Sequence, residues 1–155
     1  MKNLLEEIDI KIILFLQRVG PTLARVALFV VFFWFGFMKL FDTSPAGPLV
    51  ADLLHKTLPF VPYGNFIMFF GSYEMLIGIS FLIPGLERFA IALLVPHMIT
   101  TFMPLVLLPN VTWRGVFIPT LEGQYIIKNL VIVALAFSIA AQLKPMKVKN
   151  SKGKV

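Results

Sequence analysis

The sequence predicts an all-α membrane protein: a four-transmembrane-helix bundle preceded by an amphipathic interfacial helix. Two observations predict this class. Of the 155 residues, 58% are hydrophobic and 14% are charged, whereas a soluble domain is about 45–50% apolar and about 25% charged. The apolar residues also gather in four runs of roughly 20 residues, the length that a helix needs to cross the hydrocarbon of a bilayer.

The N-terminal residues predict an amphipathic helix that lies at the membrane interface. The apolar stretch 4–16 is interrupted by acidic residues and a lysine, so it lacks the clean apolar core of a signal peptide. Its apolar side chains share one helical face. Gly20-Pro21-Thr22 is expected to end this helix. The residues on the apolar face are Leu4, Leu5, Ile8, Ile12, Phe15 and Leu16.

Three domains follow from this reading: the interfacial helix 1–20, the bundle 21–143 and a basic cytoplasmic tail 144–155. The bundle is predicted to contain four spans joined by a long loop that holds a short helix, a tight turn at Pro84-Gly85 and a second long loop. The four spans are 23–41, 65–83, 89–108 and 124–143; the first loop is 42–64, its short helix is 49–58, and the second loop is 109–123.

Basic residues predict the orientation of the bundle. Arg18, Arg25, Arg88 and the lysine-rich tail fall on one side, and Lys56 and Arg114 on the other. Because basic residues favour the cytoplasmic side, both termini are expected in the cytoplasm of a multi-pass protein of the cell inner (plasma) membrane. The net charge of +6 is therefore assigned to the lipid bilayer as partner rather than to a nucleic acid.

Each predicted span carries one ionisable residue: Lys39, Glu74, His97 and Lys128. A charge at the bilayer centre costs at least about 2.5–3.5 kcal/mol, so such residues usually face the bundle interior. These four residues form the candidate intramembrane polar site. No catalytic residue is assigned, and the sequence leaves open whether the protein is an enzyme.

Glu74 is the strongest candidate of the four. Gly71, Glu74 and Gly78 share one helical face, and small residues on a membrane helix permit close approach of another helix. We therefore expect Glu74 to point into the bundle. Buried alone it would be neutral, and beside Lys39 or Lys128 it would be ionised. Two interpretations remain: an ion pair or hydrogen bond that joins helices, or a group that binds a ligand or moves a proton.

His97 follows Pro96 and shares a face with Thr100 and Thr101. One interpretation is an imidazole that handles protons beside a cavity. The other, which is the commoner role of a lone histidine, is a hydrogen bond to a neighbouring helix. No metal is predicted, because one histidine, one mid-membrane glutamate and no cysteine supply too few ligands.

Lys39 and Lys128 have two interpretations as well. Each lies toward one end of its span, so each can anchor its helix at the interface, and this is the better interpretation for a single lysine. The alternative is that both belong to the polar site. Gln124 and Tyr125 share a face with Lys128 and make the start of the fourth span unusually polar.

The order and spacing of three motifs resemble those of the DoxX-like superfamily. The motifs are Phe33-Trp34-Phe35-Gly36-Phe37-Met38-Lys39-Leu40, Tyr73-Glu74-Met75-Leu76-Ile77-Gly78 and Leu121-Glu122-Gly123-Gln124-Tyr125-Ile126-Ile127-Lys128-Asn129-Leu130. The resemblance spans residues 23–143 and is greatest to the branch that includes a reactive-chlorine-resistance inner-membrane protein. It implies a four-helix membrane bundle, and Lys39, Glu74 and Lys128 lie within its motifs. It supplies no shared catalytic set, and His97 lies outside it.

Three classes of function are compatible with these residues. In the first, the protein is a redox-associated subunit in stress response: a quinone is its cofactor, the lysines hold the quinone oxygens, and Glu74 and His97 relay protons. In the second, it is a non-catalytic scaffold or chaperone subunit whose charges hold the bundle together. The third is a small-solute carrier. Expected partners are a membrane or peripheral redox protein and a second copy of the chain. Because cysteine is absent, disulfide, thiol and covalent haem chemistry are excluded.

Overall fold

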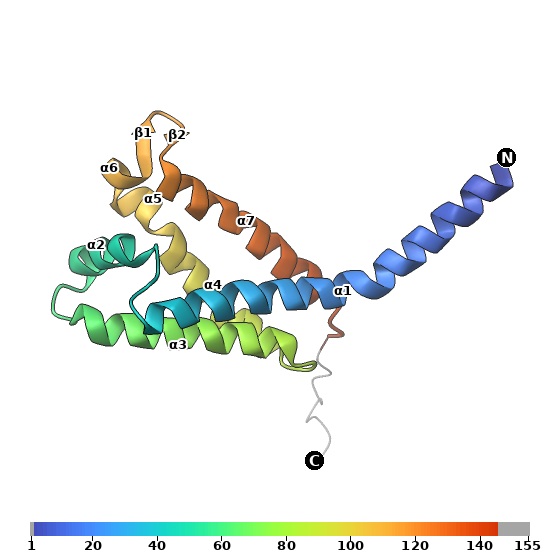
Figure 1. The fold of residues 1–155 in the computed structure, drawn as a ribbon, viewed down its shortest axis with the longest axis horizontal. Helices are drawn as coiled ribbons and strands as arrows, with labels where there is room; N and C mark the ends of the chain where they lie inside the picture. Colours follow the sequence, from blue (N-terminus) through green and yellow to red (C-terminus); the bar gives the residue numbers. More distant parts are fainter. Residues whose placement is uncertain (1, 146–155) are drawn as a thin grey trace, which may run out of the picture.

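A computed structural model describes residues 2–145, so most of the predicted basic tail lies outside the described residues. The described part holds seven helices and one two-stranded hairpin (Figure 1). In chain order they are α1 Lys2–Leu40, α2 Gly47–Thr57, α3 Tyr63–Leu82, α4 Glu87–Phe102, α5 Pro104–Leu107, α6 Pro109–Thr112, β1 Trp113–Gly115, β2 Ile118–Pro119 and α7 Leu121–Ala140.

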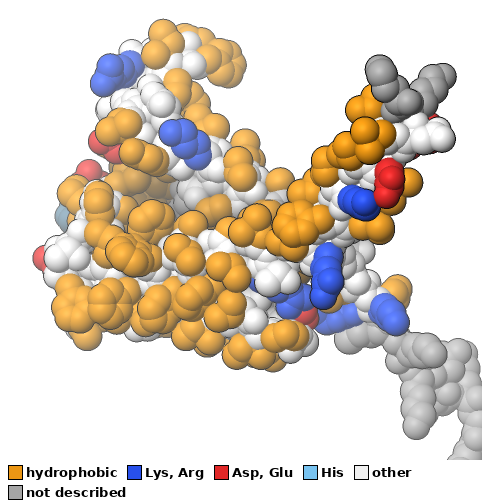
Figure 2. Space-filling view, turned by 45° about the vertical axis from the view of Figure 1, so that its right-hand side comes forward, with side chains coloured by type: hydrophobic (Ala, Val, Ile, Leu, Met, Phe, Trp, Pro, Cys, Tyr) orange, Lys and Arg blue, Asp and Glu red, His pale blue; other side chains and the backbone are white. Residues whose placement is uncertain are grey.

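The predicted fold class is confirmed. Four helical stretches are long and apolar enough to cross a membrane, and hydrophobic side chains cover most of the face seen in Figure 2. Such a surface suits hydrocarbon better than water. The four stretches are Asn3–Leu40, Tyr63–Leu82, Glu87–Leu107 and Leu121–Ala140.

The prediction that Gly20-Pro21-Thr22 ends the first helix is wrong, because α1 continues through Pro21. A proline inside a helix removes one backbone hydrogen bond, and the chain can accommodate the loss by bending. Figure 1 shows α1 changing direction where its N-terminal part leaves the bundle. With 39 residues, α1 is about 58 Å long, nearly twice the hydrocarbon thickness. The place of its exposed N-terminal part at the interface stays a prediction.

The closest helix pair in the bundle is α1 with α3, and glycines permit it. A Cβ atom built on Gly71 would lie 2.7 Å from the carbonyl oxygen of Gly36, and one built on Gly36 would lie 2.5 Å from that of Gly71. On Gly78, a Cβ would lie 3.0 Å from the backbone nitrogen of Phe33. The predicted contact of the Gly71–Glu74–Gly78 face with a neighbouring helix is thus confirmed.

Backbone geometry ends α1 just after Lys39. The amide of Thr43 donates to the carbonyl of Met38 over 3.1 Å, and that of Asp42 donates to Lys39 over 3.3 Å. Asp42 has a φ of 53°, so the two bonds form a Schellman motif in which aspartate occupies the position that glycine usually takes.

A cap of short elements covers this end of the bundle. The predicted loop helix is confirmed as α2, and α3 extends past the end of α1 to reach it (Figure 1). The Lys56 ammonium donates to the carbonyl of Leu107 over 2.6 Å, which ties α2 to α5. The Tyr63 hydroxyl donates to the carbonyl of Gly47 over 3.4 Å. Lys39 therefore lies below the cap although it occupies the last turn of its own helix.

The third span and the second long loop differ in detail from their predictions. Pro104 divides the span into α4 and α5, because proline cannot donate the next helical hydrogen bond. The loop 109–123 contains α6 and the β1–β2 hairpin, which the sequence did not reveal. The hairpin leads into α7, where the Thr120 hydroxyl caps the helix by accepting a hydrogen bond from the amide of Gly123 over 3.1 Å.

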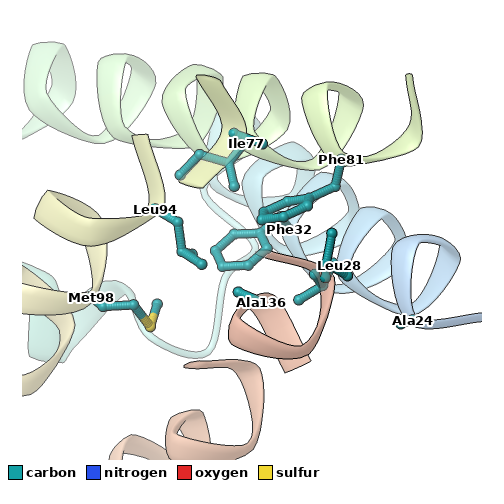
Figure 3. Packing of buried hydrophobic residues seen from close by; sticks show 10 residues of the cluster. Ala24, Leu28, Phe32, Ile77, Phe81, Leu94, Met98 and Ala136 are labelled. Carbon is teal, nitrogen blue, oxygen red and sulfur yellow. The ribbon is translucent and has the colours of Figure 1, made fainter. Parts of the chain in front are cut away.

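The apolar core lies at the other end of the bundle, where α7 approaches α1 and α4 (Figure 3). All four spanning helices contribute to it. Ile77 and Phe81 of α3 are completely buried there, and Figure 3 shows Leu28 and Phe32 of α1 beside them. The buried cluster is Ala24, Leu28, Phe32, Ile77, Phe81, Ala90, Leu94, Met98, Ala136 and Ile139.

The glycine contact can be tested with a pair of matched substitutions in α3. Gly71→Ala should destabilise the fold by about 1–3 kcal/mol, because the added methyl group meets the backbone of α1. Gly64→Ala should be neutral or slightly stabilising, because a Cβ there meets nothing within 4 Å. Thermal unfolding of both variants in the same detergent measures the difference. Equal melting temperatures would contradict the close approach.

Candidate functional site

Three ionisable side chains from three helices meet inside the bundle. Lys39 comes from the last turn of α1, Glu74 from the middle of α3 and His97 from the middle of α4. Each residue is only 5% exposed. We call these residues the triad. The structure therefore brings together three of the four predicted polar residues.

Glu74 is the centre of the triad, because each of its oxygens has a partner on another helix. The Lys39 ammonium nitrogen lies 2.6 Å from Glu74 Oε2. His97 Nε2 lies 2.9 Å from Glu74 Oε1. Both distances fit charge-assisted hydrogen bonds. One carboxylate thus connects α1, α3 and α4.

The triad continues along α4 into Thr101. The Thr101 hydroxyl oxygen lies 3.3 Å from His97 Nδ1 and 2.9 Å from the carbonyl oxygen of His97. If the hydroxyl donates to the carbonyl, its oxygen is free to accept from a protonated Nδ1. If it rotates and donates to Nδ1, the imidazole is neutral. Both states satisfy every ring nitrogen without movement of a heavy atom.

Aromatic rings enclose the triad. The Phe70 ring stacks on the His97 imidazole with centroids 5.1 Å apart and planes 8° apart. The Phe32 ring meets the same imidazole edge-on at 5.3 Å, and the Lys39 ammonium lies 5.6 Å from the centroid of Phe70. These rings exclude water, so the electrostatic attraction inside the triad is weakly screened. These aromatic neighbours were not predicted from the sequence, although Phe70 lies one helical turn from Glu74.

Lys39 is buried in the triad and does not anchor its helix at the membrane interface. The interpretation that the sequence favoured for this lysine, an interfacial anchor, is therefore wrong. Lys39 does lie in the last turn of α1, but α3 extends past this end and α2 covers it (Figure 1). Lys128 behaves differently: it is exposed on α7, and its ammonium lies 5.1 Å from the centroid of the Tyr125 ring. Gln124 and Tyr125 are also exposed. These three residues of α7 do not join the triad.

Thr100 stands beside the triad but does not belong to it. Its hydroxyl donates to the carbonyl oxygen of His97 over 2.7 Å, and its side chain is exposed on α4. Thr101 is half-buried one residue further. Of the two threonines, only Thr101 contacts the imidazole of His97, whereas Thr100 contacts the backbone carbonyl of His97.

A second ion pair joins α1 to α4 nearer the end of the bundle where α3 connects to α4. Arg25 Nη2 lies 2.5 Å from Glu87 Oε1, and the Arg88 guanidinium donates to the carbonyl of Lys144. Within residues 2–145, Nη1 of Arg25 is buried without a hydrogen-bond partner. The sequence indicated a role for Arg25 in orientation but not its pairing with Glu87.

The triad and its surroundings restrict the ligands that this site can hold. Among the described residues, no group of three or more His, Cys, Asp or Glu could bind a metal ion. Two surface recesses are lined by other residues: one by aromatic residues of α1, the other where α1 meets the end of α7. Neither of these two recesses is lined by a residue of the triad.

Comparisons of the chain with protein-family models, with curated proteins and with solved structures found no match.

The buried pair can be compared with an exposed pair of similar length. Lys39→Met should lower the free energy of unfolding by about 3–5 kcal/mol, because it leaves a buried carboxylate without its cation. Lys11→Met breaks the exposed Lys11–Glu7 pair of 2.9 Å and should cost less than about 1 kcal/mol.

The double variant Lys39→Met/Glu74→Gln removes both charges of the buried pair. It should recover part of the loss, because it leaves no uncompensated charge in the bundle. Chemical unfolding in detergent, followed by circular dichroism, measures all four proteins. If Lys39→Met and Lys11→Met cost the same, the buried pair does not stabilise the bundle.

Proposed function

We propose that this protein is a non-catalytic membrane subunit, a scaffold whose triad fixes the relative positions of α1, α3 and α4. The observation that carries the proposal is that both oxygens of Glu74 are occupied by side chains of the protein itself, at 2.6 and 2.9 Å, in a site that is 5% exposed. A catalytic carboxylate must be reached by the reacting group, whereas Glu74 is buried and the partner of each of its oxygens is a side chain of the protein itself.

The triad complements the glycine contact between α1 and α3. Glycines allow two helices to approach, but apolar packing alone tolerates sliding along the helix axis. Hydrogen bonds from one carboxylate to two other helices fix the position along the axis, because a shift of one turn breaks both. Buried polar groups are known to specify register in this way in some helical assemblies. A rigid bundle of this kind suits a subunit that presents its surface to a partner.

The membrane and orientation belong to the same proposal. Arg25 and Arg88 lie at the end of the bundle where α3 connects to α4, together with Lys144, while α2 and the hairpin lie at the other end (Figure 1). This distribution of basic residues supports an inner (plasma) membrane location with both termini in the cytoplasm. The resemblance to the DoxX-like superfamily supports a role in a membrane redox or stress-response assembly, with a redox protein or a second copy as partner.

A charge-free variant tests the scaffold proposal. Lys39→Met/Glu74→Gln removes the charges of Lys39 and Glu74 but keeps side chains of similar size, and it leaves His97 in place. If the triad is structural, the variant that inserts and folds should keep most of its function, measured as hypochlorite tolerance of cells that depend on the protein. Lys11→Met serves as the control for expression and handling. A folded double variant without function would contradict the proposal and show that the charges act chemically.

A proton-handling subunit of a redox assembly is the second candidate, and the position of Thr101 favours it. The rotation of one hydroxyl lets the site hold His97 either neutral or protonated. In this role the triad stores a proton, while a quinone or other electron carrier binds elsewhere, for example on the partner. The general-base chemistry of histidine suits such a store.

Nitrogen NMR of the histidine side chains tests this second candidate. In this role, the nitrogen signals of His97 should show both the neutral and the protonated ring while the helical content stays constant. His55→Asn assigns the signals, because the chain has two histidines. Thr101→Val should shift the Nδ1 signal of His97, since it removes the hydroxyl that contacts this nitrogen. A single protonation state over the whole pH range in which the protein stays folded would exclude the role.

A further inference from the structure

The β1–β2 hairpin presents three consecutive apolar side chains to its surroundings. Val116 is 86% exposed, Phe117 is 90% exposed and Ile118 is 59% exposed. The hairpin pairs Trp113 with Pro119 and Gly115 with Ile118, so Val116 and Phe117 form its tip. Contacts with the described residues therefore do not explain why the tip is apolar.

The backbone of the tip adds to this observation. Phe117 has a φ of 57°, in the left-handed region. Glycine or asparagine is the usual residue there, because a bulky side chain crowds its own backbone. The ring of Phe117 is exposed, so contacts within the described residues do not compensate for this backbone conformation. Strain of this kind points to a role outside the folded chain.

The base of the hairpin is firmly attached to the bundle. The Trp113 indole donates to the carbonyl of Leu105 over 2.9 Å. The Thr120 amide donates to the carbonyl of Thr112 over 2.9 Å, and the Thr120 hydroxyl donates to that of Val111 over 2.7 Å. At Gly123, an added Cβ would collide with the Thr112 carbonyl. The tip thus projects from a fixed base.

The position of the hairpin indicates what surrounds the tip. It lies where α7 begins, on the side of the bundle remote from α3 (Figure 1). The exposed apolar surface continues from the tip to Leu121, and the 61%-exposed Tyr125 follows one turn later. Arg114 is exposed on β1. An aromatic residue and a cation beside an apolar segment form the composition found where proteins meet the polar boundary of a bilayer.

We propose that the hairpin is a lipid-binding element: Val116, Phe117 and Ile118 insert into the boundary between headgroups and acyl chains, and Arg114 binds a lipid phosphate. The spanning helices place the start of α7 at the end of the hydrocarbon layer, so an adjacent tip needs no further movement to reach this boundary. Insertion also accounts for the conformation of Phe117, because that backbone directs its ring away from the protein. The inference is independent of the function of the triad.

The absence of cysteine from the sequence permits a direct test. Single cysteines at Phe117, Val131 and Asp52 are labelled with the fluorophore NBD in nanodiscs of phosphatidylcholine and phosphatidylglycerol. Val131, 69% exposed on α7, is the lipid reference. Asp52, exposed on α2, is the water reference. At Phe117→Cys, nitroxide groups near the lipid headgroup should quench the label several-fold more than at Asp52→Cys, and aqueous iodide should quench it less.

Two results would overturn the proposal. In the first, the label at Phe117→Cys is quenched like the one at Asp52→Cys, so the tip lies in water. In the second, the label is shielded from both quenchers, and the shielding increases with the number of protein copies per disc, so a second copy covers the tip.

A second label position makes the test independent of the substitution at Phe117. A cysteine at Val116 is labelled in the native background and together with Phe117→Asn, which keeps the left-handed turn but removes the ring. Quenching by headgroup nitroxides should fall several-fold in the Asn background. Unchanged quenching would show that Phe117 does not hold the tip in the lipid.

Discussion

The carboxylate of Glu74 needs a partner for each oxygen inside an apolar bundle, and much of the fold satisfies this requirement. Glu74 is only 5% exposed. An unpaired charge there would cost several kcal/mol. Its two partners come from helices that are far apart in the sequence. The bundle can therefore close correctly only when α1, α3 and α4 are all in place.

The other local features position these partners. The Gly36–Gly71 contact brings α1 close enough for Lys39 to reach Glu74 over 2.6 Å. The turn at Asp42 ends α1 directly after Lys39, and the short helix α2 occupies the space above it. The apolar core lies toward the other end of the bundle. Polar and apolar contacts therefore act on different parts of the same helices. The triad connects the helices near the cap, and the apolar core holds them together toward the other end.

Much of this arrangement could be predicted from the sequence, because it depends on local patterns. The length of the apolar runs predicts the four spans, and the spacing of Gly71 and Gly78 predicts that Glu74 points inward. The burial of Lys39 below the cap could not be predicted, because it depends on how far α3 extends past the end of α1. The continuity of α1 through Pro21 depends on how the chain leaves the bundle, and the hairpin depends on pairings too short to form a recognisable pattern.

The scaffold role and the proton-handling role of the triad rest on the same geometry. They differ in whether protons must reach the triad. On the side of Lys39, the Phe70 ring and the cap around α2 close the site. On the side of His97, the half-buried Thr101 and the exposed Thr100 follow along α4. In the proton-handling role, the group of α4 that contacts the imidazole beside the triad is the Thr101 hydroxyl, at 3.3 Å from His97 Nδ1. In a purely structural triad, the same hydroxyls only complete the hydrogen bonds of the His97 ring and carbonyl, and a methyl group in place of Thr101 Oγ1 would affect stability alone.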